Sequence, residues 1–81
     1  MKNMIAVISI VVENPESAED VNRILHVHRD AIIGRMGIPY RKKNINIISV
    51  AVDAGESEIA GMKKELGEVS GIRAASVETA E

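Results

Sequence analysis

The sequence contains no cysteine, no tryptophan and no phenylalanine among its 81 residues, and Tyr40 is its single tyrosine. Without cysteine, disulfide bonds and thiolate metal sites are excluded. Hydrophobic residues make up 46% of the chain, but aromatic residues make up only 1%. The core must therefore be built from Ile, Val, Leu, Met and Ala.

The chain also lacks a strong charge of either sign and a long apolar run. Its formal net charge is −2, so it has no field that would draw it to nucleic acid or to an anionic membrane. No apolar stretch approaches the roughly 20 residues that span a bilayer. The apolar run Ile5–Val12 is followed by Glu13, Asn14 and Pro15 and not by a small-residue cleavage site. These features predict a cytoplasmic protein with no membrane partner.

The length fits one domain, which we place at residues 1–81. Met4–Val12 is rich in Ile and Val and predicts a strand. Asn14 and Pro15 then suit the cap and first position of a helix, which we expect to run to about His28. Ala31–Ile38 predicts a second strand, and glycines within it are typical of a bulge or a close backbone approach.

A polar, basic turn over Pro39–Asn44 separates this strand from a third, Ile45–Val52. Asp53, Ala54 and Gly55 read as the next break. A second helix follows, with an apolar stripe at helical spacing, and ends at Ser70-Gly71. Ile72–Val77 predicts the fourth strand, and Glu78–Glu81 a frayed tail. The residues of the second stripe are Ile59, Met62, Leu66 and Val69.

This order of elements is βαββαβ, and it predicts an α+β protein with a ferredoxin-like fold. Helical crossovers between strands are right-handed in nearly all cases, and the short turn makes the second and third strands a hairpin. The result is a four-stranded antiparallel sheet with both helices on one face. The first and third strands form its central pair.

The central strands are apolar on both faces, which a monomer with helices on one face does not need. Strand residues alternate between faces, so one apolar set faces the helices and the other is left uncovered. An uncovered Ile/Val sheet of this size is typical of an interaction surface. We therefore predict a homo-oligomer, either a dimer or a tetramer, whose interface contains Ile5, Val7, Ser9, Val11, Ile45, Ile47, Ser49 and Ala51.

Several stretches resemble a family of small proteins named for regulation of the iron-only hydrogenase system. The most specific is Gly34–Tyr40, which reads Gly-Arg-Met-Gly-Ile-Pro-Tyr. The family is similar to ligand-sensing ACT-type domains and to the regulatory domain of the nickel-responsive repressor. The resemblance implies an ACT-like fold, oligomerisation and a regulatory role. The other stretches that carry it are Ile10–Asn14, Val21–His26, Ile32–Ile33, Arg41, Ile47–Ser49, Lys64–Gly67 and Ser70–Ile72.

The stretch from Gly34 to Arg41 is also where we expect a small effector or protein partner to bind. Two glycines let backbone approach a ligand, Arg35 supplies bidentate donors, and Tyr40 supplies the only aromatic surface. The alternative is a solvated turn beside an edge strand that is protected by charge. The predicted site residues are Gly34, Arg35, Gly37, Tyr40 and Arg41.

His26 and His28 invite a metal interpretation, because His is a common metal ligand. They fall at a helix end, however, where residues two apart diverge by about 200°, and no cysteine completes a site. We therefore predict no metal site and no cofactor. Both residues instead suit the negative end of the helix.

No pair of nucleophile and base and no carboxylate dyad is visible, so we predict that the chain is not an enzyme. The strand positions that stack bases in RNA-binding proteins of this fold are Ile, Val, Ser and Ala here, which excludes RNA. DNA is disfavoured by the net charge and by the lack of an added reading segment. The sequence thus favours an oligomeric regulatory or sensor domain. The alternatives are a structural accessory subunit without a ligand and a weak DNA-associated regulator.

Overall fold

The computed structural model describes residues 3–79. Strands β1 (Asn3–Val12), β2 (Ile32–Tyr40), β3 (Ile45–Gly55) and β4 (Ile72–Thr79) form one antiparallel sheet in the order β2-β3-β1-β4. Helix α1 (Ala18–Val27) follows β1, and helix α2 (Glu56–Gly67) follows β3. The predicted ferredoxin-like βαββαβ fold, with β1 and β3 at the centre, is confirmed.

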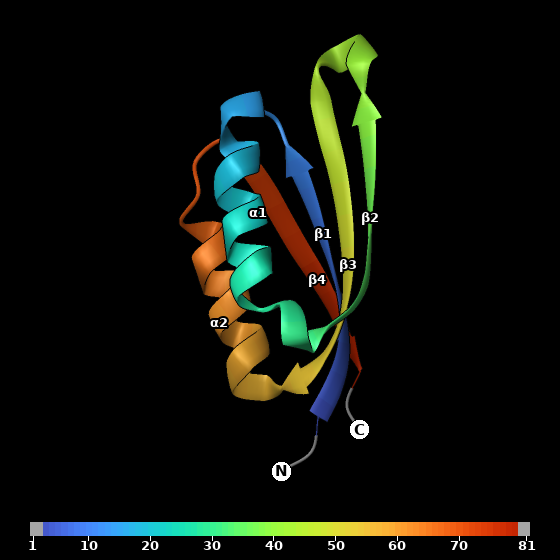
Figure 1. The fold of residues 1–81 in the computed structure, drawn as a ribbon, viewed down its shortest axis with the longest axis vertical. Coiled ribbons are helices and arrows are strands. Elements are labelled where there is room, and N and C mark those ends of the chain that lie inside the picture. The colour runs from blue at the N-terminus through green and yellow to red at the C-terminus, as the bar shows by residue number, and fades with distance from the viewer. Residues whose placement is uncertain (1–2, 80–81) are drawn as a thin grey trace.

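Both helices lie on the same side of the sheet, and the tip of the β2–β3 hairpin extends beyond them (Figure 1). On this side β1 contributes Ala6, Ile8, Ile10 and Val12, all fully buried. The alternate residues of the same strand point to the opposite side, where no element of residues 3–79 covers them. The fold is therefore two layers, with one face of the sheet open.

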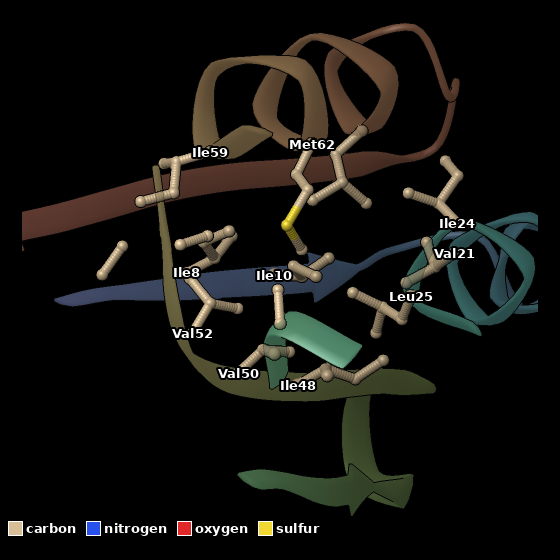
Figure 2. Packing of buried hydrophobic residues seen from close by; sticks show 14 of the residues in the cluster. Ile8, Ile10, Val21, Ile24, Leu25, Ile48, Val50, Val52, Ile59 and Met62 are labelled. Atoms are coloured by element: carbon tan, nitrogen blue, oxygen red, sulfur yellow. The ribbon is translucent and has the colours of Figure 1, made fainter. Parts of the chain in front are cut away.

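The core fills the space between the sheet and the two helices. Figure 2 shows Met62 reaching from α2 toward Ile10 of β1, beside Leu25 of α1 and Val50 of β3. All four side chains are at most 1% exposed. No aromatic side chain takes part, so aliphatic side chains and Met62 fill the core. The predicted stripe of α2 is buried at Ile59, Met62 and Leu66, and Val69 packs at its margin.

The start of the first helical segment is fixed by Asn14, as predicted. Its side-chain oxygen accepts a hydrogen bond from the backbone N–H of Glu16 at 3.0 Å. The first turn, Pro15–Ser17, is a 3-10 turn, and the α-helix proper begins at Ala18. It ends at Val27, with His28 as its cap, one residue before the expected end.

The loop before β4 packs tightly against this helix start. Gly71 has a φ of +83°, and its carbonyl oxygen accepts hydrogen bonds from the backbone N–H groups of Glu13 and Asn14. The Ser17 hydroxyl donates to the Ser70 carbonyl oxygen at 2.6 Å. We call this junction the Gly71 corner. It fixes the loop after α2 against the end of β1.

Four predicted boundaries were wrong. Pro39 and Tyr40 belong to β2 and pair with Asn46 and Ile45, although a turn was expected there. Proline is tolerated because β2 is an edge strand, where one side of the backbone needs no partner. Ala31, expected to begin β2, lies in a 3-10 turn, Arg29–Ala31.

The other two corrections lengthen β3 and β4. Asp53–Gly55 continues β3 instead of breaking it, because Ile5, Met4 and Asn3 of β1 extend the ladder opposite. Glu78 and Thr79 continue β4 by pairing with β1, where a frayed tail was expected. Ala80 and Glu81 lie outside the described residues. In each case a partner strand supplies hydrogen bonds that override a weak local preference.

The expected irregularity in β2 is present. The pairing with β3 shifts register between Ile32 and Gly34, so Ile33 is bulged out and stays 63% exposed. A β-bulge leaves one residue unpaired and bends its strand. Neither Gly34 nor Gly37 has a protein atom within 4 Å of where a Cβ would lie, so no close backbone approach within the chain requires them.

Candidate functional site

The uncovered side of the sheet is a continuous apolar surface that crosses all four strands, and we call it the open face. Cross-strand pairing sets its rows: Ser9 lies between Ser49 and Ala75, and Val7 lies between Ala51 and Val77. The open face consists of Ile5, Val7, Ser9 and Val11 of β1, Ile45, Ile47, Ser49, Ala51 and Asp53 of β3, Gly34, Met36, Ile38 and Tyr40 of β2, and Arg73, Ala75, Val77 and Thr79 of β4.

The structure places all eight residues of the predicted interface on the open face, in its two central strands. Of the eight large hydrophobic side chains that are exposed within residues 3–79, six lie on the open face. Their exposed fractions run from 37% for Ile5 to 73% for Val77. The charged residues of the face stand near its ends: Asp53 at one and Arg73, paired with Glu13 at 3.4 Å, toward the other.

The edge strands β2 and β4 add residues to the open face that were not predicted from the sequence. Met36, Ile38 and Val77 belong to the open face but were not predicted to. The signal was available, because residues two apart in a strand share a face, and Met36, Ile38 and Tyr40 follow that spacing.

The predicted ligand residues do not form one cluster. Gly34 and Tyr40 lie on the open face, whereas Arg35 and Gly37 face the helix side, opposite Val50 and Ile48. Arg41 lies in the 3-10 turn at the hairpin tip, some 20 Å along the strand from Arg35 at about 3.3 Å per residue. The basic residues Arg41–Lys43 are therefore separate from Arg35.

Arg35 instead reaches toward α1. Its guanidinium Nη2 donates a hydrogen bond to the side-chain oxygen of Asn22 at 2.8 Å. The bulge at Ile33 sets the register that places Arg35 on the helix side. Sequence reasoning assigned Arg35 to an exposed edge and did not foresee a partner on α1.

His28 joins the two helices. Its Nδ1 lies 3.2 Å from a carboxylate oxygen of Glu58, and its Nε2 lies 2.8 Å from one of Glu65. Because ionised carboxylates only accept, both bonds form together only when the imidazole is protonated on both nitrogens. Burial acts to lower the pKa of His28, but the hydrogen bonds and charges of Glu65 and Glu58 outweigh it and raise the pKa.

His26 is exposed and lies apart from this arrangement. Within residues 3–79, no three His, Asp or Glu side chains are grouped in a way that would hold a metal ion. In the same part of the chain, no helix is long and apolar enough to cross a membrane.

Comparison with known proteins identifies a family and solved structures of similar fold. Residues 4–76 match the model of a family described as "TM1266-like: Iron-only hydrogenase system regulator, putative". The uncharacterized protein TM1266 from Thermotoga maritima is 28% identical, with a TM-score of 0.92 over 98% of this chain and 100% of that one.

A formyltetrahydrofolate deformylase from Pseudomonas putida KT2440 shares only the fold, at 14% identity and a TM-score of 0.59 over 96% of this chain and 29% of that one. No curated protein matches the chain. The family match covers almost the whole described chain. The chain belongs to the TM1266-like family of iron-only hydrogenase system regulators.

Proposed function

We propose that this chain is a non-enzymatic regulatory module of the iron-only hydrogenase system that works as a homo-oligomer in the cytoplasm. A second copy of the chain covers the open face. The observation that carries the proposal is the open face itself, an apolar surface that crosses four strands with charge only near its ends. The family description supports the regulatory role.

The size of the open face is near that of the smallest specific interfaces. Four strands about 4.8 Å apart and about 23 Å of strand length give roughly 450 Å² of flat sheet per copy. Two copies that pack face to face therefore bury roughly 900 Å² of flat sheet in total, without the extra area of protruding side chains. Specific interfaces bury more than about 1,000 Å² in total. A patch of this size equals the largest apolar patch on a typical monomer, and such patches often mark a functional surface.

The relief of the open face also suits a copy of itself. Its middle row is small on three strands, with Ala75, Ser9 and Ser49 in line and Met36 at the β2 edge, and Val7 and Val11 of β1 flank Ser9. In a twofold pair the same patch meets itself. A twofold axis along the small row would bring the two sheets closest at Ser9 and Ser49, and would set each Val7 row against the partner's Val11 row.

The test is a charge placed at the centre of the open face. Ser49→Glu would bury a carboxylate without a partner at the interface, which is strongly unfavourable. We expect light scattering to show a dimer or tetramer for the wild type and a monomer for this variant. Ser57→Glu is the matched control, because Ser57 is exposed in the first turn of α2, where negative charge is favoured. It should assemble as the wild type does.

A second variant protects the test against misfolding. Val77→Glu changes a side chain on an edge strand that is already 73% exposed, so the monomer should tolerate it. It should weaken assembly while circular dichroism stays native. A wild type that is monomeric at micromolar concentration would refute the proposed assembly.

The regulatory role has its own readout. In cells that lack the chain, we expect hydrogenase transcript or activity to change, and the wild-type chain to restore it. Ser49→Glu should restore it poorly and Ser57→Glu fully. Unchanged hydrogenase levels without the chain would contradict a regulatory role and would favour a structural accessory subunit.

A further inference from the structure

A groove on the helix side of the molecule, between α1 and the beginning of β2, has the composition of a binding site. Its cavity volume is about 580 Å³, within the range of about 300–1,000 Å³ typical of small-molecule sites. It lies on the side of the sheet opposite the open face. The lining residues are Glu19, Asn22, Arg23, Leu25, His26, Arg29, Ile32 and Arg35; we call it the α1–β2 groove.

The groove concentrates positive charge in a chain whose net charge is negative. Arg35 bonds to the neutral side chain of Asn22 at 2.8 Å, and Arg29 donates to the backbone oxygen of His26 at 3.0 Å. Within residues 3–79, neither guanidinium forms an ion pair. The third arginine, Arg23, is paired with Asp20 at 3.4 Å.

These contacts orient the two free guanidiniums without using up their donors. A guanidinium has five N–H donors, and each of these two spends one on a neutral acceptor. The remaining donors suit the planar, bidentate recognition of a carboxylate or phosphate. Glu19 is the only acidic side chain in the lining, so the charge balance of the groove is positive.

Two apolar residues, Leu25 and Ile32, complete the lining with the polar side chains. Leu25 is buried and Ile32 half-buried, and both also pack against the core. Because the core fixes these two side chains, they need not move to accept a ligand. A site with an apolar floor and a few oriented polar groups is typical of small-molecule recognition.

We propose that the α1–β2 groove binds a small anionic molecule. Arg35 and Arg29 hold its carboxylate or phosphate group, and the half-buried Ile32 contacts its aliphatic part. The inference deepens the proposed function by giving the regulator a class of effector. The binding itself needs only the monomer, because every contributing residue belongs to one chain and lies away from the open face.

Backbone amide chemical shifts test the proposal with simple probes. Hexanoate carries both features, acetate carries only the charge, and hexanamide carries the chain without the charge. We expect saturable shifts at Asn22, His26 and Ile33–Arg35 with hexanoate, with a Kd on the order of millimolar for so small a ligand. Acetate and hexanamide should each bind roughly ten-fold more weakly. Hexyl phosphate in parallel shows which anionic group the groove prefers.

Two variants locate the charge recognition. Arg35→Gln and Arg29→Gln should each weaken hexanoate binding by roughly ten-fold or more, as loss of a charge-assisted hydrogen bond requires. Arg73→Gln is the matched control, because it removes the same charge from β4 at the open face. It should bind as the wild type does. Circular dichroism should be native for all three.

Equal hexanoate affinity in Arg35→Gln and Arg73→Gln would overturn the proposal. So would hexanamide shifting the same amides as strongly as hexanoate, or an absence of saturable shifts with every probe. Light scattering on the same samples separates this result from the assembly. An oligomer that does not bind the probes refutes the groove alone, and a monomer that binds them refutes the assembly alone.

Discussion

Replacement of Gly71 by alanine should be among the most damaging single-methyl changes in this protein. A Cβ at Gly71 would lie 2.6 Å from the Ser17 hydroxyl oxygen and 2.7 Å from the Asn14 Cβ, and the φ of +83° is strained for any side chain. The left-handed backbone costs about 1 kcal/mol, and displacing the Ser17–Ser70 hydrogen bond costs about 1 kcal/mol more. The sum is roughly 2 kcal/mol, or a fall in Tm of roughly 8–16 °C for a domain of this size.

Gly61→Ala supplies the opposite control. Gly61 lies inside α2, and a Cβ there would meet no atom within 4 Å. Alanine is favoured over glycine in a helix by roughly 0.5–1 kcal/mol, so this variant should melt a few degrees above the wild type. Both variants are to be compared by thermal unfolding at one protein concentration, because the Tm of an oligomer depends on it. If Gly71→Ala melts within about 2 °C of the wild type, less than the shift from 1 kcal/mol, the described corner is wrong.

Two further predictions concern the histidines. Because the pKa of His28 is raised in the folded state, its stabilising effect is full below about pH 6.5 and is lost as pH rises through the folded pKa. His28→Gln should therefore flatten the dependence of Tm on pH in that window. The stabilisation lost is under about 1 kcal/mol, because both glutamates are half-exposed. An unchanged slope would show that His28 does not contribute to the pH dependence of stability. Stoichiometric nickel or zinc should leave the Tm of the wild type unchanged, because Glu58 and Glu65 already occupy both nitrogens of His28; a rise of several degrees that His26→Gln/His28→Gln abolishes would contradict this.

The fold could be predicted because its local signals and its topology agree. The Ile/Val run of β1, the Asn14 cap and the stripe of α2 each indicate one structure, and the short hairpin turn leaves few ways to arrange four strands. The wrong strand boundaries lie where pairing with a neighbouring strand determines how far a strand extends. Pro39 predicts a turn, and only its place in an edge strand explains why it can pair with Asn46. Asp53 predicts the end of β3, and only its pairing with Ile5 explains why the strand continues.

The candidate sites were predictable to different degrees. The central part of the open face follows from the two-residue alternation of β1 and β3, which needs no tertiary information. The α1–β2 groove does not follow from any such pattern. It depends on the bulge at Ile33, which sets the side to which Arg35 points, and on Asn22, an α1 residue whose place beside β2 depends on packing.

The place of β1 in the sheet has a consequence for synthesis of the chain. Its two neighbours are β3 and β4, and neither is adjacent to it in sequence. Even its nearest pairing, of Val12 with Asn46, closes a loop of roughly thirty residues, with an entropy cost that must be met before any pairing rewards it. The Ile- and Val-rich β1 is synthesised before both of its partners, so it must wait for β3 before it can join a sheet, and for β4 before both its edges are paired. During translation, the strand at the centre of the finished sheet therefore exposes apolar side chains and unpaired edges, which are prone to aggregation.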